Sequence, residues 1–441
     1  MLHSSPRAGR HWLYQWMDEF EAFDKETVWD RLKDPRAVDR LHTISSESMF
    51  IDYSTVPLVG TVVAGTGIEL GQPGICGTLR CRKPTLDSDL GSLLHYFDYV
   101  VMQGPDPRSY RRYAEQLADR QRYPMTRLTV ARDVACLQYL RQSEITKHVV
   151  FANKPGCFCD RHFKEHADAL GLTEFTEPSM IADMAQRLTR KGLVSVEKVD
   201  PGAWYGYITR PVFLGSIGKR YEQEKPPSQA TVANDIIKRD LMSMVFDGAA
   251  ARMMGLPMAS LAVPGYFETV PGYFETERGG EGPRTIEEVA AHLTLPILSN
   301  LKTAEVVRLR ERHSADFEAF RSALREAIST TMERMPDVSP QRIAETAWQE
   351  QLKPALADLE RRISVNRRSL ALGSGTMLTI GSVTTAVASA VTAPWAAALL
   401  GAAVASTLPV AQISEYLKER KQINMSSMYF LWRAQKMQDH Y

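Results

Sequence analysis

The sequence predicts an α/β N-terminal part followed by an all-α C-terminal part that carries a long helical hairpin and a hydrophobic, Gly/Ala-rich one. Between residues 90 and 300, short apolar runs alternate with helical stretches, which favours a mixed or parallel sheet with flanking helices. Beyond residue 302 the apolar residues recur at three- and four-residue steps, as in amphipathic helices. Residues 369–414 carry no charged side chain, although 24% of the whole chain is charged.

Composition and charge define the broad class of the protein. A chain of 441 residues is too long to fold around a single hydrophobic core, so more than one domain is expected. A content of 44% hydrophobic residues is typical of globular domains. Lysine plus arginine (53) nearly balance aspartate plus glutamate (52), so the net charge does not indicate nucleic-acid binding. The segment MLHSSPRAGRHW has no apolar core of a secretory signal, and the number of cysteines, 5, is odd. We therefore expect a cytoplasmic protein with reduced thiols, associated with a membrane if the uncharged stretch inserts.

Three regions are expected in order. Residues 1–48 form N-terminal helices, because large apolar side chains such as Trp12, Trp16 and Phe20 recur at helical spacing. Residues 49–300 form the α/β module. Its strand candidates are Met49 to Asp52, Val56 to Val63, Tyr99 to Met102, His148 to Ala152, Leu193 to Val199, Ser260 to Val263 and Leu295 to Leu298. Its helix candidates are 108–121, 127–143, 160–170, 178–191, 230–254 and 285–293.

The local structure of three further segments of the α/β module can be predicted from their composition. Glycines and prolines between Gly71 and Pro84 predict loops or a hairpin, and residues 215–220 predict a basic loop. The aromatic run 204–208 is typical of a buried strand, with a ligand-binding surface as the alternative.

Residues 301–441 form the helical module. Two amphipathic helices, with apolar stripes from Val306 to Ile328 and from Ile343 to Ile363, are joined by a proline-bearing turn at 336–340. We expect these helices to bind a second copy of the chain or a partner protein.

The uncharged stretch divides at Pro394 into two halves, 372–391 and 395–413, each about as long as one bilayer crossing. Arginines at 361, 362, 367 and 368 precede the stretch, and Lys418, Arg420 and Lys421 follow it, which would keep both ends on the cytoplasmic side. The residues expected to insert are Leu372, Ile380, Val387, Val391, Trp395, Leu399, Leu400 and Val404. The arrangement resembles the hydrophobic helical hairpin of pore-forming colicins, in architecture only and over about a tenth of the chain.

The same composition suits a second interpretation. Serine, threonine, glycine and alanine outnumber the leucine, isoleucine and phenylalanine that favour insertion, so the hairpin would enter a bilayer only marginally. Packed inside the helical module, it would be ordinary buried core. A switch between a buried and an inserted state would combine the two interpretations.

Cysteine and histidine residues offer one candidate metal centre. Thiolates from Cys76, Cys81, Cys157 and Cys159, with the imidazole of His162, could form a tetrahedral structural zinc site. The spacing is irregular, so free thiols are the favoured interpretation. A catalytic cysteine with His162 or His166 as its base is a third.

Acidic residues near strand ends offer a second candidate site. Asp52 follows one predicted strand, Asp98 precedes the next, and Asp106 lies in the loop after that strand. Carboxylates suit magnesium, so together they would fit a metal-dependent hydrolase or nuclease. The ordinary explanation is capping and turn formation. No Walker A loop, GxGxxG, HExxH or GxSxG motif is present.

A tandem repeat, VPGYFETVPGYFET at 263–276, is either a local loop duplication or a partner-binding loop. Its anchors in the second case would be Tyr266, Phe267, Tyr273 and Phe274.

These observations lead to three hypotheses on function. The first is a membrane-perturbing effector, similar in design to bacterial toxins and cell-suicide defence proteins, whose α/β module senses a cue and restrains the hydrophobic hairpin. The second is a metal-dependent hydrolase or nuclease with a buried hairpin. The third is a non-enzymatic scaffold that self-associates through its long helices.

Overall fold

A computed structural model describes residues 9–48, 56–57, 60–65, 70, 79–117, 123–152, 159–170, 172–209, 216–259, 285–291, 302–336, 338, 340–361 and 426–438. The chain divides into two compact units. Unit 1 comprises Met1–Arg308 and Met332–Glu345, and unit 2 comprises Leu309–Thr331 and Thr346–Tyr441. The strand candidates at 49–52, 260–263 and 295–298, the tandem repeat and the uncharged stretch lie outside the described residues. Within the described ranges, no helix combines the length and the apolar character that crossing a bilayer requires.

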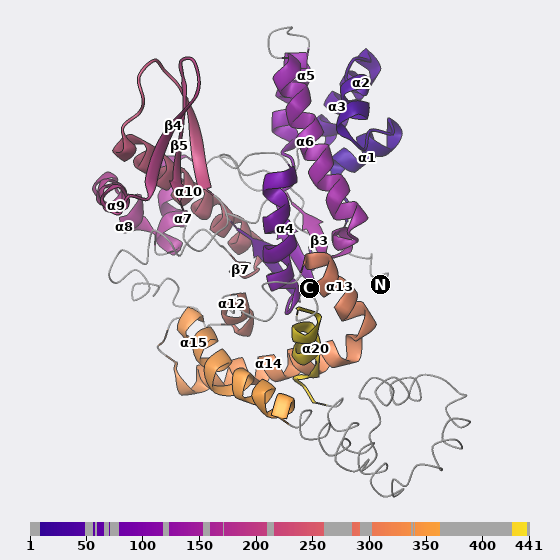
Figure 1. Ribbon diagram of the computed structural model, residues 1–441, viewed down its shortest axis with the longest axis vertical. Coiled ribbons are helices and arrows are strands. Elements are labelled where there is room, and N and C mark those ends of the chain that lie inside the picture. Colours follow the sequence, from indigo (N-terminus) through magenta and orange to yellow (C-terminus); the bar gives the residue numbers. More distant parts are fainter. Residues whose placement is uncertain are drawn as a thin grey trace, which may run out of the picture. The chain divides into compact units, whose positions relative to one another are not determined.

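Unit 1 contains a parallel four-stranded sheet, of which β3 and β7 are labelled in Figure 1. Its order is β3-β2-β1-β7, and the four strands are Val149–Phe151, Tyr99–Met102, Thr61–Ala64 and Met258–Ala259. Val62 pairs with Val100, and Val63 pairs with both Val101 and Met258. β1 is buried along its whole length, as expected of a parallel strand covered on both faces. The predicted α/β class is therefore confirmed, with a parallel sheet.

Helices α4 (Leu79–Leu94), α5 (Pro107–Leu117) and α6 (Tyr123–Gln142) connect the first three strands, and the short helix η1 (Ile145–His148) leads into β3. Leu86, Leu90 and Leu94 of α4 are buried. The segment 79–84 is therefore the beginning of a helix, and the prediction of loops or a hairpin there is wrong. Pro84 and the glycines before it are typical of loops, which led to the wrong prediction. The apolar residues that indicate a helix come later in α4.

A second, antiparallel sheet is formed by a later part of the sequence of unit 1 (Figure 1). Helices α7 (Asp160–Ala169), α8 (Thr173–Thr176) and α9 (Pro178–Arg190) precede strands β4 (Val194–Asp200), β5 (Ala203–Thr209) and β6 (Ser216–Glu222). The prediction of a strand at 204–208 is confirmed by β5. The prediction of a basic loop at 215–220 is wrong over 216–220, because that segment pairs with β5 along its length.

Helix α10 (Gln229–Met254) belongs to the cores of both sheets. Ser228 caps its first turn by accepting a hydrogen bond from the backbone N–H of Thr231 at 3.0 Å, and Gly255 ends it in the left-handed conformation at φ 65°. Val232 packs with the second sheet, whereas the end of the helix, including Met254, packs with the parallel one. One helix thus joins the two cores of unit 1.

The contact between α10 and β5 requires a glycine. A Cβ atom at Gly206 would lie 2.5 Å from Cγ2 of Val232. We expect Gly206→Ala to lower the free energy of unfolding by about 1–3 kcal/mol, since overpacking shifts side chains or backbone. Amide hydrogen exchange of β5 and α10 measures this change in local stability. The double variant Gly206→Ala with Val232→Ala should recover part of the loss, and strictly additive effects would contradict the proposed clash.

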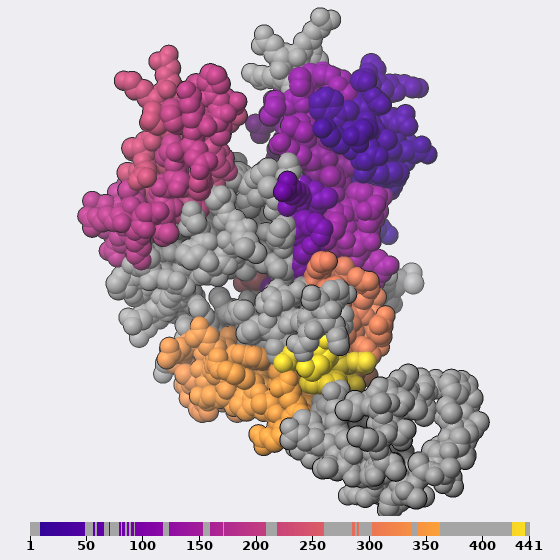
Figure 2. Space-filling model, viewed as in Figure 1, coloured from indigo at the N-terminus to yellow at the C-terminus, as the bar shows by residue number. Residues whose placement is uncertain are grey.

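Three N-terminal helices, α1 (Trp12–Glu19), α2 (Lys25–Arg31) and α3 (Pro35–Glu47), pack against α5 and α6. The indigo surface of these helices is continuous with the purple surface of α5 and α6 (Figure 2). Trp16 is fully buried, and its Nε1 donates a hydrogen bond to the carbonyl of Ala37 at 2.9 Å. Asp34 caps α3, which begins at Pro35.

The remaining described elements are α12 (Ile286–Ala291), α13 (Thr303–Arg312), α14 (Ser314–Arg334), α15 (Pro340–Ala347), the π-helical turn η2 (Trp348–Leu352) and α20 (Tyr429–Gln438). Within unit 2, Phe430 of α20 stacks on Phe320 of α14 at 5.7 Å and meets Phe317 edge-on at 5.1 Å. Gln351 of η2 donates hydrogen bonds to the carbonyl of Ala327 and the hydroxyl of Thr331. The helical character predicted for this part of the chain is observed in these segments.

Candidate functional site

A small cavity lies where the chain leaves β2, at the carboxyl edge of the parallel sheet. Open α/β sheets bind their ligands at this edge. The cavity has a volume of about 170 Å³. It is lined by Gln103, Gly104, Pro105 and Asp106 of the loop, Ser109, Tyr110 and Tyr113 of α5, Arg82 of α4, and Thr129, Arg132 and Asp133 of α6. We call this cavity the strand-end crevice.

The N-terminal helices hold the loop of the crevice in place. Nε1 of Trp12 donates a hydrogen bond to the carbonyl of Pro105 at 3.0 Å. A Cβ atom at Gly104 would collide with the ring of His11, so glycine is required for this close approach. Burial lowers the pKa of His11 to about 3, so its imidazole is neutral at physiological pH.

Asp106 has a structural role at the mouth of the crevice. Its Oδ1 accepts hydrogen bonds from the backbone N–H and from Nε of Arg108, each at 3.1 Å. The carboxylate therefore caps the first turn of α5 and forms an ion pair with Arg108. This is the capping role that the sequence offered as the ordinary explanation for Asp106.

Asp133 is the most perturbed carboxyl group of the crevice. The hydroxyl of Tyr110 donates a hydrogen bond to its Oδ2 at 2.8 Å. Burial raises the pKa of Asp133 to about 6, against the lowering effects of that hydrogen bond and of Arg82 and Arg132. Burial also raises the pKa of the neighbouring Cys136 thiol to about 11, so the thiol is protonated and unreactive.

Two arginines supply positive charge inside the crevice. Arg82 is only 7% exposed. Nε of Arg132 is buried and has no hydrogen-bond partner among the described residues. Both guanidinium groups lie close enough to Asp133 to lower its pKa. Buried guanidinium groups gain most from a partner with two acceptor oxygens, such as a carboxylate or a phosphate.

The structure separates two of the predicted acidic ligands. Asp98 precedes β2 and Asp106 follows it, so the four strand residues, at about 3.3 Å each, lie between them. The carboxylate of Asp98 lies instead over Gly60, at the turn into β1. Asp52, the third predicted ligand, lies outside the described residues. Asp98 and Asp106 therefore do not share a site.

Two of the predicted zinc ligands lie together. Sγ of Cys159 is 3.1 Å from Nδ1 of His162, and both side chains are exposed at the start of α7. Cys76 and Cys157 lie outside the described residues, as does the side chain of Cys81 in α4. Within the described ranges, no group of three or more His, Cys, Asp or Glu side chains could hold a metal ion.

The other predicted site residues also lie outside the described part of the chain. They are the membrane-inserting candidates Leu372, Ile380, Val387, Val391, Trp395, Leu399, Leu400 and Val404, and the partner-binding candidates Tyr266, Phe267, Tyr273 and Phe274.

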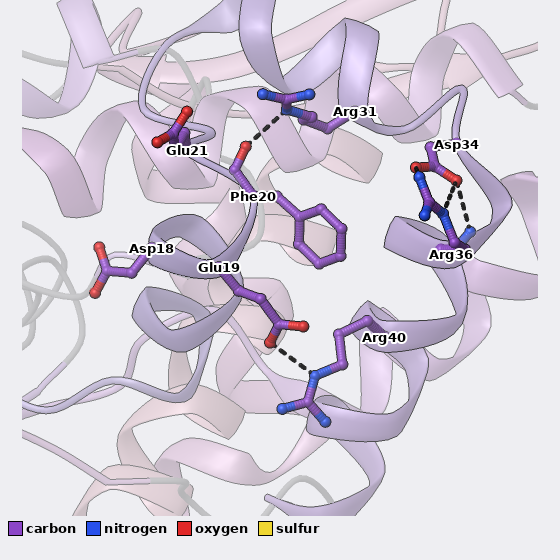
Figure 3. Close-up of a pocket in the computed structure, with 8 residues that line it drawn as sticks. All are labelled: Asp18, Glu19, Phe20, Glu21, Arg31, Asp34, Arg36 and Arg40. Carbon is purple, nitrogen blue, oxygen red and sulfur yellow. Dashed lines mark hydrogen bonds and ion pairs between the residues drawn. The ribbon is translucent and has the colours of Figure 1, made fainter.

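A larger depression of about 590 Å³ lies on the N-terminal helices (Figure 3). Its charged side chains mostly satisfy one another. Arg40 pairs with Glu19 at 2.8 Å, Arg36 pairs with Asp34 at 3.0 Å, and Nε of Arg31 donates a hydrogen bond to the carbonyl of Phe20. The contact of Arg40 with Glu19 connects α3 to α1, and that of Arg31 with Phe20 connects α2 to the end of α1, so we assign the depression a structural role.

The sequence indicated only Asp106 among the crevice residues. Arg82, Arg132 and Asp133 lie on helices, where charged residues are common, and only the packing of α4, α5 and α6 brings them together. The spacing of Arg132 and Asp133 carries no motif. No family model matches the chain, and comparisons with curated proteins and with solved structures find no match either.

Proposed function

We propose that the chain is a membrane-perturbing effector of the toxin or cell-suicide type, in which the α/β part senses a cue and restrains a C-terminal hydrophobic hairpin. The observation that carries the proposal is the absence of charge from residues 369–414, between basic residues on both sides. Each half is about one bilayer thickness long. Its modest hydrophobicity would permit a state outside the membrane as well as an inserted one.

The strand-end crevice supports the sensing role. It is a concave site at the edge of a parallel sheet where ligands bind, and it contains buried charged groups. The hydrolase alternative gains no support from Asp98 and Asp106, because they lie at opposite ends of β2.

A charge in the hairpin should abolish membrane activity. A charged side chain near the bilayer centre costs about 3 kcal/mol. We expect Val387→Asp to reduce dye release from anionic lipid vesicles about tenfold or more, whereas Val387→Leu retains it. Circular dichroism of both variants checks that they fold. Absence of release and of vesicle binding by the unaltered chain, or full release by folded Val387→Asp, would overturn the proposal.

A further inference from the structure

A buried guanidinium nitrogen in the strand-end crevice lacks an acceptor. Nε of Arg132 is shielded from solvent and has no hydrogen-bond partner among the described residues. Asp106 cannot serve it as a dedicated partner, because that carboxylate is engaged by Arg108 and by the first turn of α5. Burying a charged group is costly unless it is paired, so this nitrogen favours the entry of an anion.

The surroundings of Arg132 strengthen the preference for an anion. Arg82 lies near enough to the same carboxyl group, Asp133, to lower its pKa, so a second positive charge acts on the crevice. Tyr113 lines the same cavity and carries a hydroxyl group. The hydroxyl groups of Ser109 and Thr129, which also line it, already donate hydrogen bonds to Asp106 and to the carbonyl of Met125. Hydroxyl groups donate hydrogen bonds to anionic oxygens, and a guanidinium group matches two oxygens of a phosphate at once.

The size of the crevice limits the ligand. Its volume of about 170 Å³ is below the roughly 300–1,000 Å³ of pockets that take drug-sized ligands. The crevice therefore suits a phosphate group with a short organic moiety better than a larger ligand.

We propose that the strand-end crevice binds a small phosphorylated ligand, with its phosphate group between Arg82 and Arg132. The inference rests on the proposed function in that it names the class of cue that the α/β part senses. Its test involves no membrane, so failure of phosphate binding and failure of vesicle leakage are distinguishable.

Calorimetric titration of the full chain with inorganic phosphate and with glycerol phosphate tests the proposal. We expect Arg132→Gln to weaken binding about tenfold or more, because a charge-assisted contact is lost. Arg111→Gln, an exposed position on α5, is the matched control and should bind as the unaltered chain does. Tighter binding of glycerol phosphate than of phosphate would identify an ester as the ligand class.

Amide hydrogen exchange of the unaltered chain provides a measurement that does not depend on the stability of a variant. Phosphate should slow exchange at the start of α5 and near Arg132 relative to chloride at equal ionic strength. Absence of binding by both phosphate compounds, or binding that Arg132→Gln leaves unchanged, would overturn the proposal.

Discussion

Replacing Phe430 with alanine is expected to lower the local free energy of unfolding in unit 2 by about 3–5 kcal/mol. Phe430 is fully buried and contacts both Phe317 and Phe320. Truncation would remove its apolar contacts and leave a cavity between α14 and α20. Amide hydrogen exchange of these two helices measures the change, because the chain has more than one compact unit and global unfolding need not be two-state.

Two further variants make this result specific. Phe430→Leu should cost less, since it leaves a smaller cavity. Ser322→Ala changes an exposed residue on α14 and should have little effect. Unchanged exchange in Phe430→Ala would show that α20 does not stabilise α14.

Replacing Asp133 with asparagine is expected to remove a pH dependence from the stability of unit 1. The folded-state pKa of about 6 lies above the ordinary value of 3.8. The folded protein therefore holds this proton more tightly, and its stabilising effect is lost as the pH rises through about 6. Over the whole titration the shift corresponds to about 3 kcal/mol, and about half of that is lost between pH 5 and pH 8. Asp133→Asn should therefore gain stability relative to the unaltered chain at pH 8 more than at pH 5, by about 1–1.5 kcal/mol.

Amide hydrogen exchange of α5 and α6 at pH 5 and pH 8, corrected for the intrinsic exchange rate at each pH, measures this difference. The asparagine side chain retains an oxygen that can accept the hydrogen bond from Tyr110. Asp39→Asn alters an exposed carboxylate and serves as the control. If the stability of Asp133→Asn and that of the unaltered chain depended equally on pH, the raised pKa of Asp133 would be contradicted.

The sequence predicts an element correctly where both its apolar pattern and the residues that end it are local. β2 was predicted at Tyr99–Met102, where it is found, because an apolar run lies between Asp98 and Gly104. α10 was predicted at 230–254 and is found at Gln229–Met254, where Ser228 and Gly255 provide its caps. In both segments, pattern and end signals agree.

Other elements depend on neighbours that are distant in the sequence. β6 has little apolar alternation of its own and is specified by its pairing with β5. The crevice depends on such packing even more strongly. Arg82 and Arg132 come from different helices, and the spacing between them in the sequence gives no indication that they line one cavity.

The pairing of β1 with β7 affects how the chain can fold during synthesis. The N–H groups of Val63 and Gly65 donate to the carbonyls of Pro257 and Ala259, which the ribosome adds only after the whole antiparallel sheet. Until then the nascent chain presents an unsatisfied strand edge, which is prone to pair with other chains. Protection of that edge by a chaperone would therefore be most valuable before residue 259 emerges.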